Sequence, residues 1–222
     1  MKKLTTLLAG AMLMMATSAM AGNLLTNGSF ENGLDGWTFT ASDTSYPVAV
    51  IQGTPGSAYP TGAFGEAIPV DDILGGSPDA AGTHEAYFVS DTAVQTLTQS
   101  VFLNAGLYEI GFDTYSPGNG FHNLYDASFR GTIAHNLLAS FNVHNQTVQQ
   151  WLHFSGIADV TSSGSYDVAF EFYPGGKPAS DVVIDRVYIE SVPVPEPGTM
   201  MLLGVGMFGL AVFGKRRMNK EA

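Results

Sequence analysis

The chain has 222 residues, of which 45% are hydrophobic and 13% are charged, and it contains no cysteine. Its formal net charge at pH 7 is −11; such an acidic surface repels nucleic acid and anionic membranes, so nucleic acid is not an expected partner. Without cysteine the chain forms no disulfide, and its stability must come from a hydrophobic core, with or without a bound metal.

The N-terminal segment is typical of a signal peptide. Two lysines precede an apolar stretch at residues 4–15, and Ala19 and Ala21 supply the small residues that signal peptidase requires at its cleavage site. A membrane anchor is the alternative, but this apolar stretch is shorter than the roughly 20 residues that cross a bilayer. We therefore expect residues 1–21 to form a signal helix that is removed during export.

Residues 22–192 have the period-two pattern of a β-sheet domain. Apolar and more polar residues alternate at 108–113 and again at 166–172, so each strand has one apolar face. Between about eight and ten short antiparallel strands, punctuated by Gly, Pro, Asn and Asp, predict an all-β fold, an antiparallel β-sandwich of the jelly-roll type. Trp37, just after a Gly turn, is expected to lie in its interior. The other expected strands are 37–41, 48–52, 86–90, 95–103, 127–133, 137–143, 148–154 and 181–192.

One long stretch, residues 42–85, departs from this rhythm. It is crowded with Gly, Pro, Asp and Ala, and connections of this length are usually functional or mobile. We expect it to cross one end or one face of the sandwich. Four apolar side chains are expected to order part of it: Tyr46, Tyr59, Phe64 and Ile73.

The segment at residues 115–126 mixes aromatic side chains with amides and carboxylates. Sugars stack their apolar faces on aromatic rings while their hydroxyls bond to such polar neighbours, so this segment predicts a glycan-binding surface. In the alternative interpretation the rings cover the end of the sandwich, and the Asn and Gly residues form tight turns. The candidate glycan-binding residues are Tyr115, Phe121, Asn123, Tyr125 and Trp151.

The chain has no recognisable catalytic motif. Its five histidines lack the His-Glu-x-x-His spacing of zinc hydrolases, and no Gly-x-Ser-x-Gly elbow is present. The acidic residues are too numerous for their sequence positions to indicate a glycosidase pair. We therefore predict a protein that is not an enzyme.

The C-terminal tail, residues 193–222, has three parts in a fixed order. An uncharged apolar stretch at 199–214 is followed by a basic end, an order that fits the positive-inside rule. The stretch is about 16 residues long and therefore marginal for permanent spanning. The tripeptide before it is Pro195, Glu196 and Pro197, and the basic end begins with Lys215, Arg216 and Arg217.

This tail resembles the PEP-CTERM sorting signal of Gram-negative bacteria that produce exopolysaccharide. The resemblance implies recognition by an exosortase, a single transmembrane helix at 199–214 and cleavage near residues 195–197. It also implies a transient stay in the inner membrane followed by delivery to the cell surface or the extracellular matrix. An ordinary C-terminal anchor is the alternative.

The domain at 22–192 is similar to the galactose-binding-like jelly rolls found in many carbohydrate-binding modules. The similarity rests on the opening segment 23–37, on the hairpin at 99–112 and on the closing strand at 183–187. These segments are spread over the whole domain, which supports the fold more than the function.

The same resemblance implies a structural calcium ion (Ca2+) where the first and last strands of such domains meet. Its carboxylate ligands would be Glu31 and Asp185, with backbone carbonyls near Asn27 and Ser29, because calcium prefers several oxygen ligands. The closing strand often carries two adjacent acids, whereas here Asp185 is followed by Arg186. In the alternative interpretation Glu31 caps a turn and Asp185 pairs with an arginine.

Two functions from different classes fit these observations best, and a polysaccharide-processing enzyme is a third alternative. The favoured one is a structural or adhesive role in an exopolysaccharide matrix or biofilm, with extracellular polysaccharide as the partner. The alternative is a lectin-like module that recognises a neutral glycan, since an acidic surface favours neutral partners over anionic ones.

Overall fold

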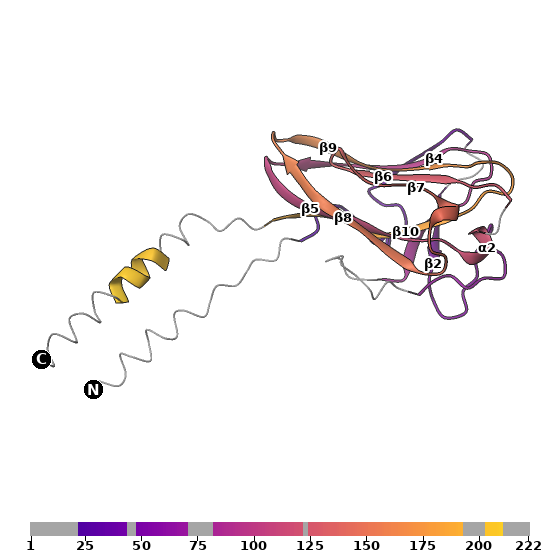
Figure 1. The fold of residues 1–222 in the computed structure, drawn as a ribbon, viewed down its shortest axis with the longest axis horizontal. Coiled ribbons are helices and arrows are strands. Elements are labelled where there is room, and N and C mark those ends of the chain that lie inside the picture. Colours follow the sequence, from indigo (N-terminus) through magenta and orange to yellow (C-terminus); the bar gives the residue numbers. More distant parts are fainter. Residues whose placement is uncertain (1–21, 44–47, 71–81, 122–123, 193–202, 211–222) are drawn as a thin grey trace, which may run out of the picture. The chain divides into compact units, whose positions relative to one another are not determined.

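The computed structural model describes residues 22–43, 48–70, 82–121, 124–192 and 203–210. Met20–Val192 form one compact unit. Within it, two five-stranded antiparallel sheets face each other, the first in the order β1-β4-β9-β6-β7 and the second in the order β2-β3-β10-β5-β8 (Figure 1). The predicted all-β antiparallel sandwich is confirmed.

The expected strands are present, and three of them are longer than expected. The first sheet contains β1 (Thr38–Ala41), β4 (Gln95–Leu103), β9 (Gly164–Tyr173), β6 (Ser128–Ile133) and β7 (Asn136–Asn142). The second sheet contains β2 (Ala49–Gln52), β3 (His84–Phe88), β10 (Val182–Ser191), β5 (Gly106–Tyr115) and β8 (Trp151–Val160). Two single turns of helix connect strands, namely α2 (Gly118–Phe121) and the 3-10 helix η1 (Val143–Asn145).

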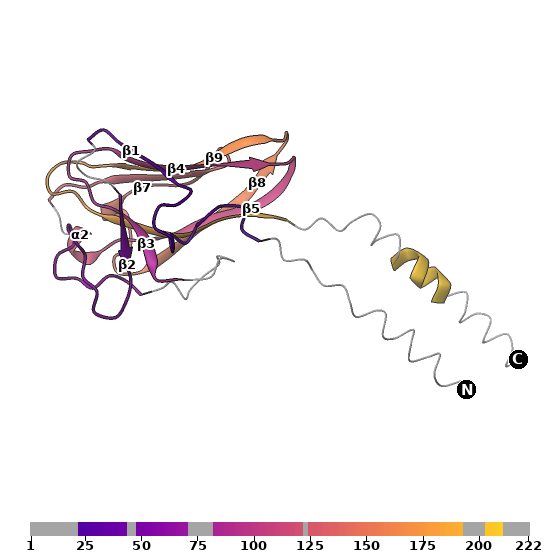
Figure 2. The same ribbon diagram turned by 180° about the vertical axis from the view of Figure 1, so that it is seen from behind.

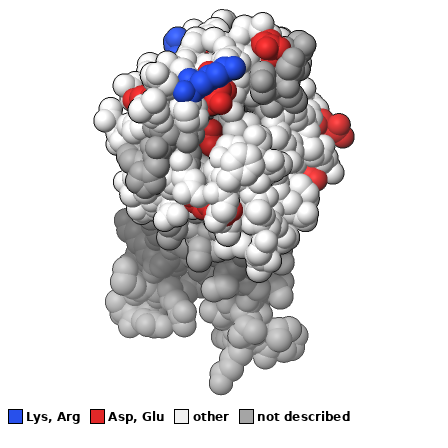
Figure 3. All heavy atoms as spheres, turned by 90° about the vertical axis from the view of Figure 1, so that its right-hand side faces the viewer, with Lys and Arg blue, Asp and Glu red and all other residues white. Residues whose placement is uncertain are grey.

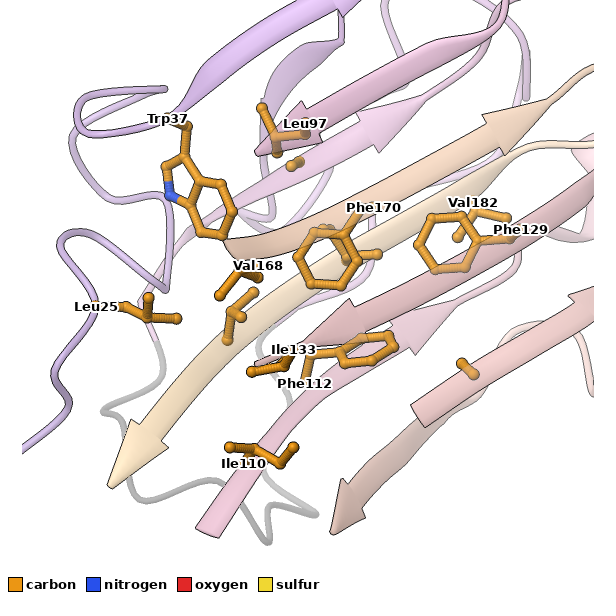
Figure 4. Packing of buried hydrophobic residues seen from close by; sticks show 14 of the residues in the cluster. Leu25, Trp37, Leu97, Ile110, Phe112, Phe129, Ile133, Val168, Phe170 and Val182 are labelled. Atoms are coloured by element: carbon orange, nitrogen blue, oxygen red, sulfur yellow. The ribbon is translucent and has the colours of Figure 1, made fainter. Parts of the chain in front are cut away.

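Period-two alternation builds the core between the sheets. In β9, Val168, Phe170 and Phe172 are fully buried, whereas the residues between them point away from the core. The Phe170 ring lies 4.9 Å from the ring of Phe112 and 6.1 Å from that of Phe129, which come from the second and first sheets (Figure 4). Each buried phenylalanine contributes about 1.5–3 kcal/mol, so these rings hold the two sheets together.

Trp37 lies in this core, as predicted. Its side chain is 8% exposed, and its ring packs 5.3 Å from Phe30 and 6.0 Å from Phe170. The indole Nε1–H donates to the carbonyl of Asn27 at 3.0 Å, which satisfies its polar atom. Trp37 therefore anchors the opening segment to the core.

The opening segment lies beside the last strand, as expected, but it is not a regular strand. Leu24 N–H donates to a β10 carbonyl at 2.9 Å, and the Asn23 side chain bonds one carbonyl and one N–H of β10 at 2.8 and 3.1 Å. Asn27 and Phe30 have φ values of 53° and 56°, a backbone region that strands do not use. Side-chain bonds and turns therefore replace a regular ladder here.

The two ends of the domain differ in character. At one end, called here the loop end, β3, β5 and β9 finish and β4, β6, β8 and β10 begin. The opposite end, called here the terminus end, holds the tight β4–β5 and β8–β9 turns and the exit of the chain after β10. Figures 1 and 2 show α2 at the loop end.

The long excursion covers the part of the second sheet's outer face that lies next to the loop end. After β2, residues 53–70, called here the flap, fold back on themselves through a bridge between Ala58 and Ala67. The flap buries Tyr59, whose ring lies 4.9 Å from that of Tyr87 on β3. The cluster beneath it contains Ile51, Tyr59, Ala63, Ile68, Tyr87, Tyr115, Trp151 and Val183.

The expected ordering of the excursion by apolar side chains holds only in part. Tyr59 is buried, as expected, but Phe64 is 68% exposed because it sits at the tip of the flap between Gly62 and Gly65, both with positive φ. There its backbone carbonyl, and not its ring, makes the contact by accepting a bond from Asn119. Tyr46 and Ile73 lie outside the residues that the structure describes.

The second compact unit combines Met1–Ala19 with Pro193–Ala222, and only its residues 203–210 are described. These residues are helical. In the described part of the chain, no helix is both long and apolar enough to cross a membrane. The expected signal helix at 1–21 and half of the expected transmembrane helix at 199–214 lie outside the described residues, together with Ala19, Ala21, Pro195, Glu196, Pro197, Lys215, Arg216 and Arg217.

Candidate glycan-binding surface

Three polar or aromatic side chains are exposed on the outer face of the first sheet near the loop end. Tyr173 is 40% exposed, and its hydroxyl donates to Glu171 Oε1 at 3.1 Å. Arg130, opposite Glu171 in the ladder, places its Nη1 3.7 Å from Glu171 Oε2. Because both ends of this ion pair are solvent-exposed, it contributes little stability and leaves most guanidinium N–H groups free to bond a ligand.

Tyr125 presents a second exposed ring at the loop end. Its ring is 45% exposed, yet its backbone is fixed, because its N–H donates to Pro178 at 3.2 Å and its carbonyl accepts from Ser180 at 3.1 Å. The ring lies over Gly176, where a Cβ atom would approach it to 2.7 Å. Tyr125 is therefore a preorganised ring, which costs little entropy when a ligand stacks on it.

The two tyrosines flank the same turn. Tyr173 ends β9 opposite Ser128, and the turn that follows packs on the segment of Tyr125, since a Cβ at Gly175 would lie 1.7 Å from the Asp126 carbonyl oxygen. Figure 3 looks onto this end and shows a largely uncharged surface on which basic and acidic atoms lie close together near the top. The loop-end surface is defined here as Tyr125, Asp126, Arg130, His144, Glu171 and Tyr173.

Asp126 and His144 supply further hydrogen-bonding groups to this surface. Their side chains are each 32% exposed, and His144 Nδ1 lies 2.7 Å from Asp126 Oδ1. The same oxygen accepts the backbone N–H of His144 at 2.9 Å, which fixes η1 against the loop before β6. Rings flanked by fixed carboxylate, imidazole and guanidinium groups form a combination suited to sugar hydroxyls.

Tyr115 and Trp151, two predicted glycan contacts, lie elsewhere. They are opposite each other on β5 and β8, with ring centroids 5.5 Å apart, and are only 8% and 9% exposed. The flap closes over them, since Trp151 Nε1 donates to the Val70 carbonyl and the Tyr115 hydroxyl donates to Glu66, both at 3.4 Å. In this arrangement these two rings pack against protein, as in the alternative interpretation.

The remaining predicted contacts are placed only in part. Phe121 ends α2, but its side chain is not described, and Asn123 lies outside the described residues. Tyr173, Glu171 and Arg130 were not predicted. The alternation along 166–172 already predicts that the side chain of residue 173 points away from the core, and Pro-Gly-Gly follows it. An outward-pointing aromatic residue beside a turn was therefore the sequence signal that could have identified Tyr173.

A buried polar row crosses the outer face of the second sheet. Asp113 and Asp185 face each other across β5 and β10, and both are fully buried. His153 Nδ1 lies 2.5 Å from Asp113 Oδ1, and Arg186 Nε lies 4.0 Å from Asp113 Oδ2. Arg186 has a φ of 51° at an irregularity in the ladder. These contacts compensate the buried charge of Asp113 within the protein.

The residues predicted to bind calcium are engaged with protein groups. Glu31 Oε1 accepts the backbone N–H groups of Thr83 and His84 at 2.6 and 2.7 Å. Burial alone would raise the pKa of Glu31, but these bonds hold it below the ordinary value. Glu31 thus fixes the chain where the excursion enters β3.

The other expected calcium ligands show the same behaviour. Asp185 Oδ1 accepts the N–H of Arg186 at 2.6 Å, the Asn27 carbonyl accepts from Trp37, and Ser29 lies in the same turn. Among the residues with described positions, no group of three or more His, Asp or Glu side chains is arranged to hold a metal. Calcium binding by Glu31, Asp185, Asn27 and Ser29 stays a prediction.

Comparison with known proteins identifies the tail and the fold separately. Residues 193–217 match the PEP-CTERM protein-sorting motif. No curated protein sequence matches the chain. Among solved structures, TmCBM61, solved in complex with β-1,4-galactotriose, has a TM-score of 0.50 and 18% identity over 78% of this chain and 100% of that one.

Other similar structures include both binding modules and an enzyme. The CBM22-1 xylan-binding domain of Paenibacillus barcinonensis Xyn10C is 17% identical, with a TM-score of 0.43, over 80% of this chain and 99% of that one. The enzymatically active domain of tailspike protein 4 from bacteriophage CBA120 is 15% identical, with a TM-score of 0.45, over 77% of this chain and 21% of that one. At these identities the likeness concerns the fold alone.

The PEP-CTERM motif indicates an exported protein of Gram-negative bacteria and implies processing by an exosortase. The jelly-roll prediction is confirmed by the fold shared with TmCBM61. The chain thus combines a jelly-roll domain whose structural neighbours include carbohydrate-binding modules with a C-terminal PEP-CTERM sorting motif.

Proposed function

We propose that this protein is a non-enzymatic component of the cell surface or exopolysaccharide matrix, where its jelly-roll domain holds extracellular polysaccharide at the loop-end surface. The observation that carries the proposal is the pair of exposed rings, Tyr125 and Tyr173, on either side of one fixed turn. Carbohydrate-binding neighbours with the same fold support it, as does the sorting motif that delivers the domain to the outside of the cell.

The polysaccharide is expected to be neutral. The domain at 22–192 carries 18 acidic residues against Arg130, Lys177 and Arg186, and its field repels uronate-rich chains. Neutral sugars carry no charge and are therefore not repelled by this field. Their hydroxyls can both donate to carboxylates and accept from the guanidinium of Arg130.

Binding of purified residues 22–192 to a panel of neutral and acidic polysaccharides tests the proposal. Tyr125→Ala and Tyr173→Ala should each weaken binding about 3- to 10-fold, since a stacked ring contributes about 0.5–1.5 kcal/mol beyond area burial. Phe102→Ala is the matched control, because Phe102 is 65% exposed but lies at the terminus end. Binding that survives both tyrosine substitutions would remove the loop-end surface from consideration.

The lectin-like alternative makes a different prediction from the same panel. A lectin saturates with a defined short oligosaccharide, because its pocket surrounds a few sugar units. A matrix protein with an open surface binds long polymers much more strongly than their fragments, since many weak contacts add along the chain. The exposure of Tyr125 and Tyr173 to solvent favours the second behaviour.

A further inference from the structure

The flap is fastened to the second sheet by a buried carboxyl–hydroxyl pair. The Tyr87 hydroxyl donates to Asp181 Oδ2 at 2.7 Å and accepts the backbone N–H of Ala63 at 3.2 Å. Tyr87 is fully buried and Asp181 is 1% exposed. A Cβ at Gly62 would lie 2.3 Å from the Tyr87 hydroxyl and 2.6 Å from Asp181 Oδ2. The backbone of the flap thus sits directly on this pair.

The charged groups that face Asp181 have the same sign as an ionised carboxylate. Glu66 faces it from the flap and Asp91 from the β3–β4 connection, while Tyr87 is its hydrogen-bonding partner on β3. Tyr59 of the flap and Glu85 of β3 belong to the same electrostatic cluster. The adjacent Ser180 places its Oγ 3.5 Å from His144 Nδ1. A negative charge on Asp181 is therefore poorly tolerated while the flap is closed.

Burial, followed by the effects of Asp91 and Glu66, raises the pKa of Asp181 to about 7, although the bond from Tyr87 lowers it. Asp181 is thus largely protonated in the closed state at mildly acidic pH. As the pH rises, ionisation of this buried group favours any arrangement that gives it water.

The flap also covers an aromatic pair that could bind a ligand if uncovered. Trp151 and Tyr115 lie side by side beneath it, each touching it through one hydrogen bond of 3.4 Å. Such long bonds hold the flap weakly over the rings. At the Tyr87–Asp181 pair the flap is attached through the N–H of Ala63, which donates to the Tyr87 hydroxyl at 3.2 Å. Further attachments are the bond from the Asn119 N–H to Glu66 and the bond from the Gly53 N–H to the Thr83 carbonyl, both at 2.8 Å.

We propose that residues 53–70 form a pH-released cover over the Tyr115–Trp151 pair, closed while Asp181 is protonated and opened when Asp181 ionises. Opening exposes a second stacking surface, placed on the outer face of the second sheet. Only this use of the exposed rings rests on the proposed glycan-binding function; the latch stands on its own contacts.

Hydrogen–deuterium exchange of the full chain between pH 5.5 and 8.5, corrected for the intrinsic pH dependence of exchange, tests the latch without any glycan. The protection of residues 57–68 should fall by up to about tenfold per pH unit as the pH rises toward 7, because the open state loses the proton of Asp181 and the closed state keeps it. Above pH 7 both states have lost this proton, so protection should level off. Residues 166–172 of β9 serve as the internal reference and should not change.

Two variants separate the latch from general loosening. Asp181→Asn keeps an acceptor for the Tyr87 hydroxyl but cannot ionise, so its flap should stay protected at all pH values. Tyr87→Phe removes the bond to Ala63 and should lower protection already at pH 6. Asp159→Asn, at an exposed position on β8, should behave as wild type. A wild-type flap with pH-independent protection, or an unchanged pH response in Asp181→Asn, would overturn the proposal whatever the glycan assays show.

Discussion

The two outer faces of the sandwich start from the same sequence pattern and end in opposite environments. On the first sheet, Arg130, Glu171 and Tyr173 point outward and meet water. On the second sheet, Asp113 and Asp185 also point away from the core, yet they are fully buried. Alternation decides which side chains leave the core, but contacts with neighbouring side chains and with connecting segments decide whether they reach solvent.

The carboxylates of the two faces are compensated differently. A buried carboxylate costs several kcal/mol unless it is paired, and Asp113 is accordingly placed beside His153 and near Arg186. The irregular ladder after Asp185 helps by letting Arg186 adopt a positive φ. On the open face, Glu171 pairs with Arg130 and accepts from Tyr173, solvent shares its charge, and the ladder through it is regular.

Truncating one aromatic on each face gives the largest contrast. Trp151→Ala should lower the free energy of unfolding by about 3–5 kcal/mol, because a large ring that is only 9% exposed leaves a cavity under the flap. Tyr173→Ala should change it by less than about 0.5 kcal/mol, as usual for surface positions. Urea denaturation at pH 6.5 measures both, and similar losses in the two variants would contradict the distinction between the faces.

The pH dependence of stability sharpens the comparison at Asp181. Its pKa in the folded state is raised from 3.8 to about 7, so between these values the folded chain binds the extra proton and stability falls as pH rises. The free energy gained by Asp181→Asn over wild type should therefore grow between pH 4 and pH 7, by up to about 4 kcal/mol. Above pH 7 it should level off. Denaturation of both proteins across this range provides the measurement, with Asp159→Asn expected to show no such trend.

The fold was predictable because its signals are local. The inward positions Val168, Phe170 and Phe172 are visible in the sequence as every second residue, and they form the core that the structure shows. The same alternation determines which way Tyr173 points. Tyr173 belongs to the candidate site because the turn at 174–177 packs against Tyr125. These two segments are about 50 positions apart, so no local sequence pattern predicts their contact.

The candidate site was predicted only in part because burial is a long-range property. Tyr115 and Tyr125 occur in one short segment with similar neighbours. The flap, which begins some 60 residues before Tyr115, covers that residue and leaves Tyr125 exposed. Glu31 shows the same limit, since its partners Thr83 and His84 lie more than 50 positions away. The family resemblance predicts Glu31 as a calcium ligand, which stays a prediction, but the clamp on two backbone N–H groups could not be read from the sequence.

The smallest effect is expected at this clamp, which holds the chain where the excursion that forms the flap returns to β3. Glu31→Gln weakens the bonds to Thr83 and His84 and should cost about 1–2 kcal/mol at pH 7. Because the folded-state pKa of Glu31 is lowered from 4.5, its contribution is present above pH 4.5 and is lost as the pH falls through the lowered value. The cost of the substitution should therefore shrink at acidic pH.

Thermal unfolding in EDTA and then in calcium separates the clamp from the predicted metal site. The stability lost in Glu31→Gln through the weakened bonds to Thr83 and His84 should persist in EDTA, because these bonds involve only protein groups. A calcium site at Glu31 and Asp185 would add a rise in Tm with calcium in wild type that Glu31→Gln lacks, since only the folded state holds the ion. An unchanged wild-type Tm would remove calcium and leave the clamp. Glu31 would then be a structural support of the covered face, comparable to Asp113 but exposed enough for solvent to share the charge.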